Sequence, residues 1–177
     1  MNAIRTLTLT AGLAACLAGP ALARADATVK EAESAVTVLK KADPTLTKFF
    51  DRSAGYAVFP GVAKGGLVVG GAGGSGFVFE KGTAVGKTTL SQVSIGAQVG
   101  GQAYYEIIFF ETAETLAAFK KGEWTMAAQV SAVALTAGAS ADASYKDGVA
   151  VFTLSRGGAM AEASVGGQKF TYKAIGT

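Results

Sequence analysis

The chain has 177 residues, enough for one domain, and half of them are hydrophobic, enough for a sizeable core. It contains no histidine, the most frequent general base and a common zinc ligand, and its single cysteine excludes an internal disulfide. The formal net charge of +3 falls to +1 if residues 1–25 are removed, leaving 14 basic and 13 acidic side chains. Such a balance gives little support to a basic patch, so we expect no nucleic-acid partner.

Residues 1–25 have the pattern of an export signal. Arg5 is a short basic region, Leu7–Leu17 is apolar, and small residues follow up to Ala25. Cleavage after Ala25 is one route. The run Leu13-Ala14-Ala15-Cys16 also resembles the lipobox of bacterial lipoproteins, in which Cys16 would be acylated. We therefore expect an exported protein of the periplasm or outer membrane, with one domain over residues 26–177.

The first exported segment predicts an amphipathic helix over residues 26–42, capped by Asp26. Val29, Ala32, Val36 and Leu39 fall on one stripe of this helix. Asp43 and Pro44 then predict the start of a second, short helix, with Asp43 as cap and Pro44 in the first turn. Leu46, Phe49 and Phe50 give that helix an apolar face, and Ser53-Ala54-Gly55 ends it.

From Gly55 onward the apolar period changes to two, which predicts strands. One helix interrupts them over residues 112–121, with Gly122 as its left-handed stop. In the strand over 88–99, Val93 and Ile95 are expected on the apolar face and Gln92 on the wet face. The expected strands are 55–60, 65–71, 76–80, 88–99, 102–111, 124–135, 148–155, 158–165 and 169–173.

These elements predict an α+β fold. We expect a curved or barrel-like, mainly antiparallel, glycine-rich β-sheet with the N-terminal helices packed on it and one helix inserted between strands. Glycine inside a strand permits the sharp bending and close backbone approach that such a sheet needs.

Two glycine-rich segments imitate nucleotide-binding motifs. Residues 71–76 match G-x-G-x-x-G, but the residues that follow predict a strand, whereas the dinucleotide motif requires a helix. Residues 82–88 lack one of the four positions that a P-loop needs between its glycines, and a hairpin turn is the better interpretation. No histidine is available to activate a serine, and no S-x-x-K motif is present. We expect no catalytic residues, no metal and no cofactor.

The densest basic group of the exported chain predicts a lipid-contacting surface. It surrounds two phenylalanines, which we expect to be exposed, and cations beside apolar side chains suit an anionic membrane. Packing of the helix stripe on the protein's own core is the competing interpretation. The predicted lipid-binding residues are Lys30, Lys40, Lys41, Lys48, Phe49, Phe50 and Arg52; an alternative surface is formed by the loops around Lys64, Lys81 and Lys87.

Several spaced motifs resemble the SYLF family, also called the Ysc84 or DUF500 family. Ser53–Gly66 is similar to its opening A-x-G-x-A-x-F-P-x-x-x-K-x-G element, and Leu67–Gly76 to its glycine-rich second strand. Ser94–Gly100 matches S-x-G-x-Q-x-G, and Ser155–Gly167 resembles the closing segment. The chain departs from the family pattern at Ala128, where an acid is expected, and it has Leu154-Ser155 in place of a Tyr-Ser pair.

The resemblance implies a non-enzymatic domain that associates with phospholipid at the cell envelope, with an anionic phospholipid or membrane surface as partner. Two alternatives stay open. One is a structural envelope protein that binds a protein partner, and the other is a carrier of a small apolar ligand.

Overall fold

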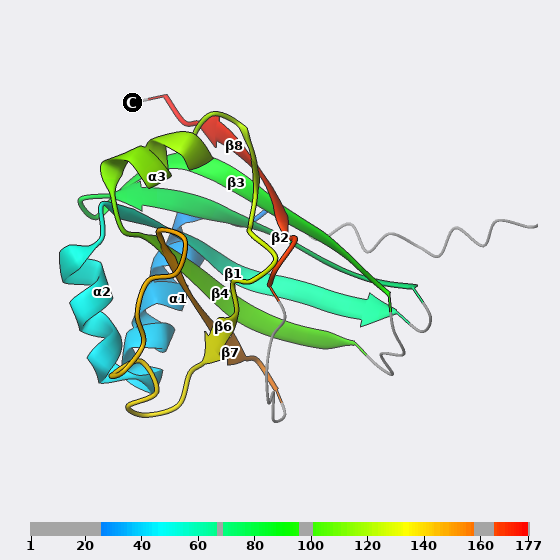
Figure 1. Ribbon diagram of the computed structural model, residues 1–177, viewed down its shortest axis with the longest axis horizontal. Helices are drawn as coiled ribbons and strands as arrows, with labels where there is room; N and C mark the ends of the chain where they lie inside the picture. The colour runs from blue at the N-terminus through cyan, green and yellow to red at the C-terminus, as the bar shows by residue number, and fades with distance from the viewer. Residues whose placement is uncertain (1–25, 67–68, 96–100, 158–164, 177) are drawn as a thin grey trace, which may run out of the picture.

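The computed structural model describes residues 26–66, 69–95, 101–157 and 165–176. Its elements form an eight-stranded sheet with helices on both faces (Figure 1). The helices are α1 (Val29–Ala42), the 3-10 turn η1 (Pro44–Leu46), α2 (Thr47–Arg52) and α3 (Ala113–Phe119). The strands are β1 (Gly55–Gly66), β2 (Val69–Glu80), β3 (Thr83–Ile95), β4 (Gln102–Phe110), β5 (Glu123–Thr125), β6 (Ala132–Ala134), β7 (Val149–Ser155) and β8 (Lys169–Ala174).

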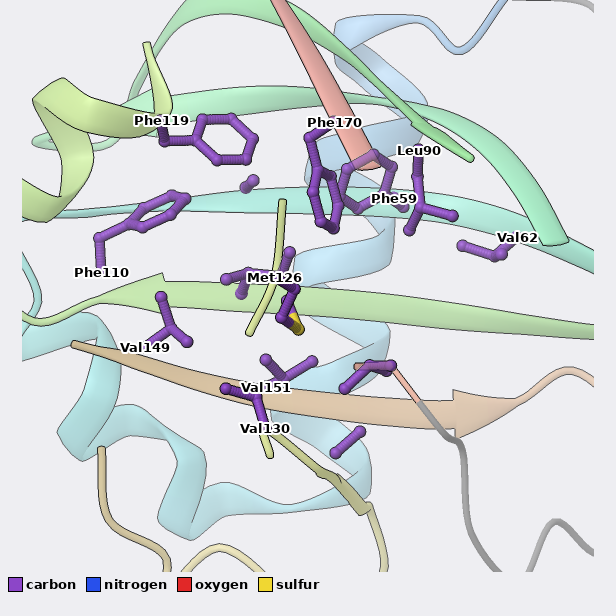
Figure 2. Packing of buried hydrophobic residues seen from close by; sticks show 14 of the residues in the cluster. Phe59, Val62, Leu90, Phe110, Phe119, Met126, Val130, Val149, Val151 and Phe170 are labelled. Carbon is purple, nitrogen blue, oxygen red and sulfur yellow. The ribbon is translucent and has the colours of Figure 1, made fainter. Parts of the chain in front are cut away.

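The sheet has the order β5-β8-β3-β2-β1-β4-β7-β6, and it curls into a half-barrel. All its pairs are antiparallel except β6 with β7. The curl brings Phe59 of β1 within 5.8 Å of Phe170 of β8, centroid to centroid, although β2 and β3 separate these strands. Figure 2 shows both rings in the interior, with Leu90 and Met126 close by. The predicted α+β fold with a curved, mainly antiparallel sheet is therefore confirmed.

The N-terminal helices cover the outer face of the sheet. Ala32, Ala35 and Leu39 of α1 are buried there with Phe49 of α2, and they pack on β1, β4 and β7 side chains such as Phe109. The helix begins later than predicted and has a different cap. Thr28, not Asp26, accepts from the Glu31 amide, and the Glu31 carboxylate accepts from the Thr28 amide. This reciprocal pair satisfies two helix-end amides, which a lone Asp26 could not do.

The glycine-rich segment forms two long strands, so the prediction of three short ones over 55–60, 65–71 and 76–80 is wrong. Residues 70–73 are paired with both β1 and β3, and residues 74–76 are paired with β3. A Cβ atom at Gly76 would lie 2.2 Å from the Val58 carbonyl oxygen, so only glycine permits this backbone approach. The residues after 71–76 continue β2 as a strand. This confirms the prediction that no helix follows the G-x-G-x-x-G match, as a dinucleotide motif would require.

Two further strand predictions need correction. The expected turn over 82–88 is confined to Lys81-Gly82, with φ of 50° and 79°, and the chain from Thr83 is already β3. The expected strand over 124–135 is split into β5, which pairs with β8, and β6, which pairs with β7; the Val130 amide donates to the Ala127 carbonyl in the turn between them. Residues 158–164 of the strand expected over 158–165, and residues 96–99 of the one expected over 88–99, lie outside the described residues.

The expected faces of β3 are inverted at Gln92 and Val93. Val93 is 81% exposed, whereas Gln92 is buried and its Nε2 donates to the Gly166 carbonyl at 3.2 Å. Leu90 precedes Gln92 by two residues and belongs to the interior cluster, so this face of β3 points into the half-barrel. Within the described part of the chain, no helix is long and apolar enough to cross a membrane.

Candidate functional site

A cavity of about 300 Å³ lies between α2 and the segment that precedes β7. Three of the predicted lipid-binding residues line it: Lys48, Phe49 and Arg52. The remaining walls come from residues far along the chain, namely Glu111, Ala143, Ser144 and Tyr145. The fold therefore joins part of the predicted basic group to a segment that the sequence did not associate with it.

Asp43 holds this segment against the helices. Its carboxylate accepts from the amides of Gly138 at 3.1 Å and Ser140 at 2.7 Å, and from the Thr45 amide at 3.0 Å. Burial alone would raise the pKa of Asp43, but hydrogen bonds from Thr45 and Ser140 outweigh burial and lower the pKa to about 2. The predicted role of Asp43 as a cap is confirmed, and its second role as an anchor for residues 138–140 is additional.

The α2 side of the cavity combines a cation with a buried ring. The Lys48 ammonium donates to the carbonyl oxygens of Ala141 and Ala143 and lies 5.0 Å from the Phe49 ring centroid. Phe49 is 3% exposed and packs 4.8 Å from Phe152. The expectation that Phe49 is exposed is wrong, because the ring is part of the core between α2 and the sheet.

Phe50 is half-buried rather than exposed. Its ring lies 4.8 Å from Phe109 and 5.0 Å from Tyr56, and the Lys40 ammonium sits 4.1 Å from its centroid. Lys40 therefore covers an aromatic face, which leaves its charge near the surface of α1.

Tyr145 contributes a buried hydroxyl to the cavity wall. Among the described residues this hydroxyl has no hydrogen-bond partner, and its ring lies 5.4 Å from that of Phe49. Burial raises the pKa of Tyr145, Glu111 raises it further, and Arg52 opposes both. The site therefore offers a neutral hydroxyl beside two cations, a combination that suits an oxygen-rich anion.

The remaining predicted residues do not join this cavity. Lys30 and Lys41 are exposed on α1, at its two ends. In the alternative surface, Lys64 of β1 lies opposite Ala72 of β2, and Lys81 follows the end of β2. Lys81 comes nine residues after Ala72, which is about 30 Å in an extended strand. Lys87 pairs across strands with Lys173 and lies 3.7 Å from an oxygen of Asp26. These three lysines do not form one surface.

A buried carboxyl group inside the half-barrel was not singled out by the sequence. Glu106 of β4 is fully buried and accepts a hydrogen bond of 3.1 Å from Nε2 of Gln168, across the interior. Burial raises the pKa of Glu106 to about 8, against the lowering effect of the Gln168 bond. The group is therefore neutral near pH 7. The alternation of residues along the strand puts Glu106 on the same face as Tyr104 and Ile108. It does not show that other parts of the protein pack over that face.

The described residues contain no group of three or more His, Cys, Asp or Glu side chains placed to hold a metal ion. The predicted lipidation site Cys16 and the rest of the export signal lie outside the described residues. They therefore stay predictions.

The second half of the chain matches a known family model. Residues 91–174 match the Ysc84 family model, described as Las17-binding protein actin regulator, which confirms the predicted resemblance. The chain is also similar to Beta cell expansion factor A of Aeromonas veronii, with 29% identity over 142 residues. That alignment covers 78% of this chain and 53% of the relative, so the chain spans about half the length of the relative.

Proposed function

We propose that this chain, whose residues 91–174 match the Ysc84 family, is a non-enzymatic domain that binds anionic phospholipid at the bacterial cell envelope. The observation that carries the proposal is the cavity beside α2, where Lys48 and Arg52 stand next to the buried Tyr145 hydroxyl. A phosphodiester headgroup would place its charged oxygens between the two cations, with the Phe49 ring and Ala143 as apolar walls.

The charge of the cavity supports a monoanionic headgroup. Glu111 lines the same cavity, so two basic groups face one acidic group. The single excess positive charge matches one phosphodiester. The Lys48 ammonium already donates to two backbone carbonyls, so it is held in place before a ligand arrives, and less side-chain entropy is lost on binding.

Vesicle flotation tests the proposal with a matched pair of variants. The cavity variant is Lys48→Gln with Arg52→Gln, and the control is Lys121→Gln with Lys169→Gln, which removes the same charge from exposed positions elsewhere. Each basic group near an anionic surface contributes about 1 kcal/mol, so the cavity variant should bind anionic vesicles about 30-fold more weakly. The control variant should lose clearly less affinity for anionic vesicles.

The outcomes separate three interpretations. Equal losses in both variants would show diffuse attraction and refute the cavity as the headgroup site. Equal binding of the parent protein to anionic and neutral vesicles would refute anionic-lipid binding and favour a protein partner at the envelope.

Export and envelope location are part of the same proposal. Mass spectrometry of the mature N-terminus after cell fractionation tests both processing routes. A chain starting at Asp26 supports a periplasmic form, an acylated Cys16 supports a lipoprotein, and an uncleaved cytosolic chain would refute export.

A further inference from the structure

An open cleft of about 180 Å³ lies on the outer face of the sheet, beside α1 and away from the cavity described above. Its walls include Glu31 and Val38 of α1, Pro60 of β1, Ser75 of β2, Tyr105 of β4, and Arg156 just after β7. Ligand pockets usually measure about 300–1,000 Å³, so this cleft suits a small molecule or a single end group.

The cleft exists because β1 bulges at this point. The register of β1 shifts between Val58 and Ala63 against β2, and between Phe59 and Val62 against β4. The bulge removes Pro60 from the regular ladder, and bulges of this kind often lie beside binding sites. The chain before α1 is held at the same place, because the Ala27 amide donates to the Ser75 hydroxyl at 2.8 Å.

Arg156 is pre-organised on one side of the cleft. Its guanidinium lies 4.9 Å from the centre of the Tyr105 ring, and Nη1 donates to the Pro60 carbonyl at 3.3 Å. Its backbone amide is fixed by the Ala103 carbonyl at 2.9 Å. A guanidinium has five donors in a planar fork, so one bond to Pro60 leaves a second edge that can hold a carboxylate or other oxyanion.

Glu31 places the opposite charge on the helix wall. Its Oε2 accepts from the Thr28 amide at 2.8 Å and from the Thr28 hydroxyl at 2.9 Å, so the capping box orients the carboxylate. The same cleft also has apolar wall residues. Val38 is among the few large hydrophobic side chains that the described residues expose, at 38%, and Pro60 faces the same cleft.

We propose that this cleft binds a small zwitterion, of which an α-amino acid with a small apolar side chain is the simplest example. The ligand's anionic group meets Arg156, its ammonium group meets Glu31, and its apolar part lies against Val38 and Pro60. A doubly charged anion is disfavoured because Glu31 would repel it, and a simple cation because Arg156 would. The inference is independent of the lipid site, which uses other residues and a net positive charge.

Two variants separate this proposal from a structural role of the same residues. Glu31→Gln keeps the capping box, because glutamine also accepts from the cap amide, but it removes the negative charge. Arg156→Gln removes the positive charge at an exposed position. Lys121→Gln, just after α3, is the control, since it changes charge away from the cleft.

The test is a titration followed by amide NMR shifts, with L-alanine as the zwitterion and acetate and ethylamine as single-charge probes. Saturable shifts at Gly61, Ser75 and Arg156 are expected with L-alanine, and each single-charge probe should bind at least about tenfold more weakly. Glu31→Gln and Arg156→Gln should each weaken L-alanine about tenfold, and Lys121→Gln should not. Glycerophosphoethanolamine is a parallel arm, and tighter binding of that probe would identify a lipid headgroup as the source of the zwitterion.

Two results would overturn the inference. If acetate binds as tightly as L-alanine and Glu31→Gln has no effect, the cleft is a plain anion site. If none of the probes gives saturable shifts up to about 50 mM, a concentration far above useful affinities, the cleft is not a zwitterion site.

Discussion

The buried carboxyl of Glu106 predicts that stability falls as the solution becomes alkaline. In the folded protein the pKa is about 8, against 4.5 for an unperturbed side chain, and burial is the main cause. Between these values the unfolded chain releases a proton that the folded chain retains. The free energy of unfolding therefore decreases from pH 4.5 upward and levels off above pH 8, by about 1.4 kcal/mol per pH unit and up to about 5 kcal/mol in total.

The substitution Glu106→Gln removes the titration while keeping an oxygen to accept from Gln168. We expect the variant to lose most of this pH dependence and to be more stable than the parent protein above pH 8 by up to several kcal/mol. Urea unfolding at about pH 6 and about pH 9 checks this, with Trp124 fluorescence as the signal because Trp124 packs 5.6 Å from Phe170 in the interior.

Glu123→Gln on strand β5, where Glu123 is exposed, is the control. It should leave the free energy of unfolding unchanged at both pH values. The reasoning is refuted if the parent protein is equally stable at both pH values. It is also refuted if Glu106→Gln keeps the parent's full pH dependence.

Three further predictions concern stability. Asp43→Ala should lower the free energy of unfolding by about 3 kcal/mol, because it removes a cap and the bonds to Gly138 and Ser140; urea unfolding with Lys41→Ala as control measures this. Since the folded pKa of Asp43 is about 2, below its ordinary 3.8, the parent should lose about 2 kcal/mol as pH falls through this window, and the variant should not. Gly76→Ala should lower the free energy of unfolding by more than about 3 kcal/mol, because the new Cβ would lie 2.2 Å from a backbone oxygen. Gly101→Ala is the control: its Cβ would have nothing within 4 Å, and it should lower the free energy of unfolding by under about 0.5 kcal/mol. Equal losses in the two variants would contradict this reasoning.

Local pattern alone was sufficient for the helices and for the curved sheet. The apolar stripe predicted α1, and the Asp43-Pro44 pair predicted the start of the next turn, because caps and helical faces depend on residues a few positions apart. Gly122 was predicted as a left-handed stop and has φ of 114°. The density of glycine in strands predicted a bent sheet, which the half-barrel confirms.

Tertiary packing decided the strand lengths and the composition of both candidate sites. Glycine is a poor strand former by itself, yet residues 70–76 extend β2 because β3 pairs with all of them and β1 pairs with residues 70–73, while Gly76 lies close against the Val58 carbonyl. Arg52 and Tyr145 share a cavity because Asp43 and Lys48 hold the segment over 138–143 against the helices. The burial of Phe49 and Glu106 likewise depends on elements distant in the chain, since a residue's own neighbours in sequence do not show what covers its face of the sheet.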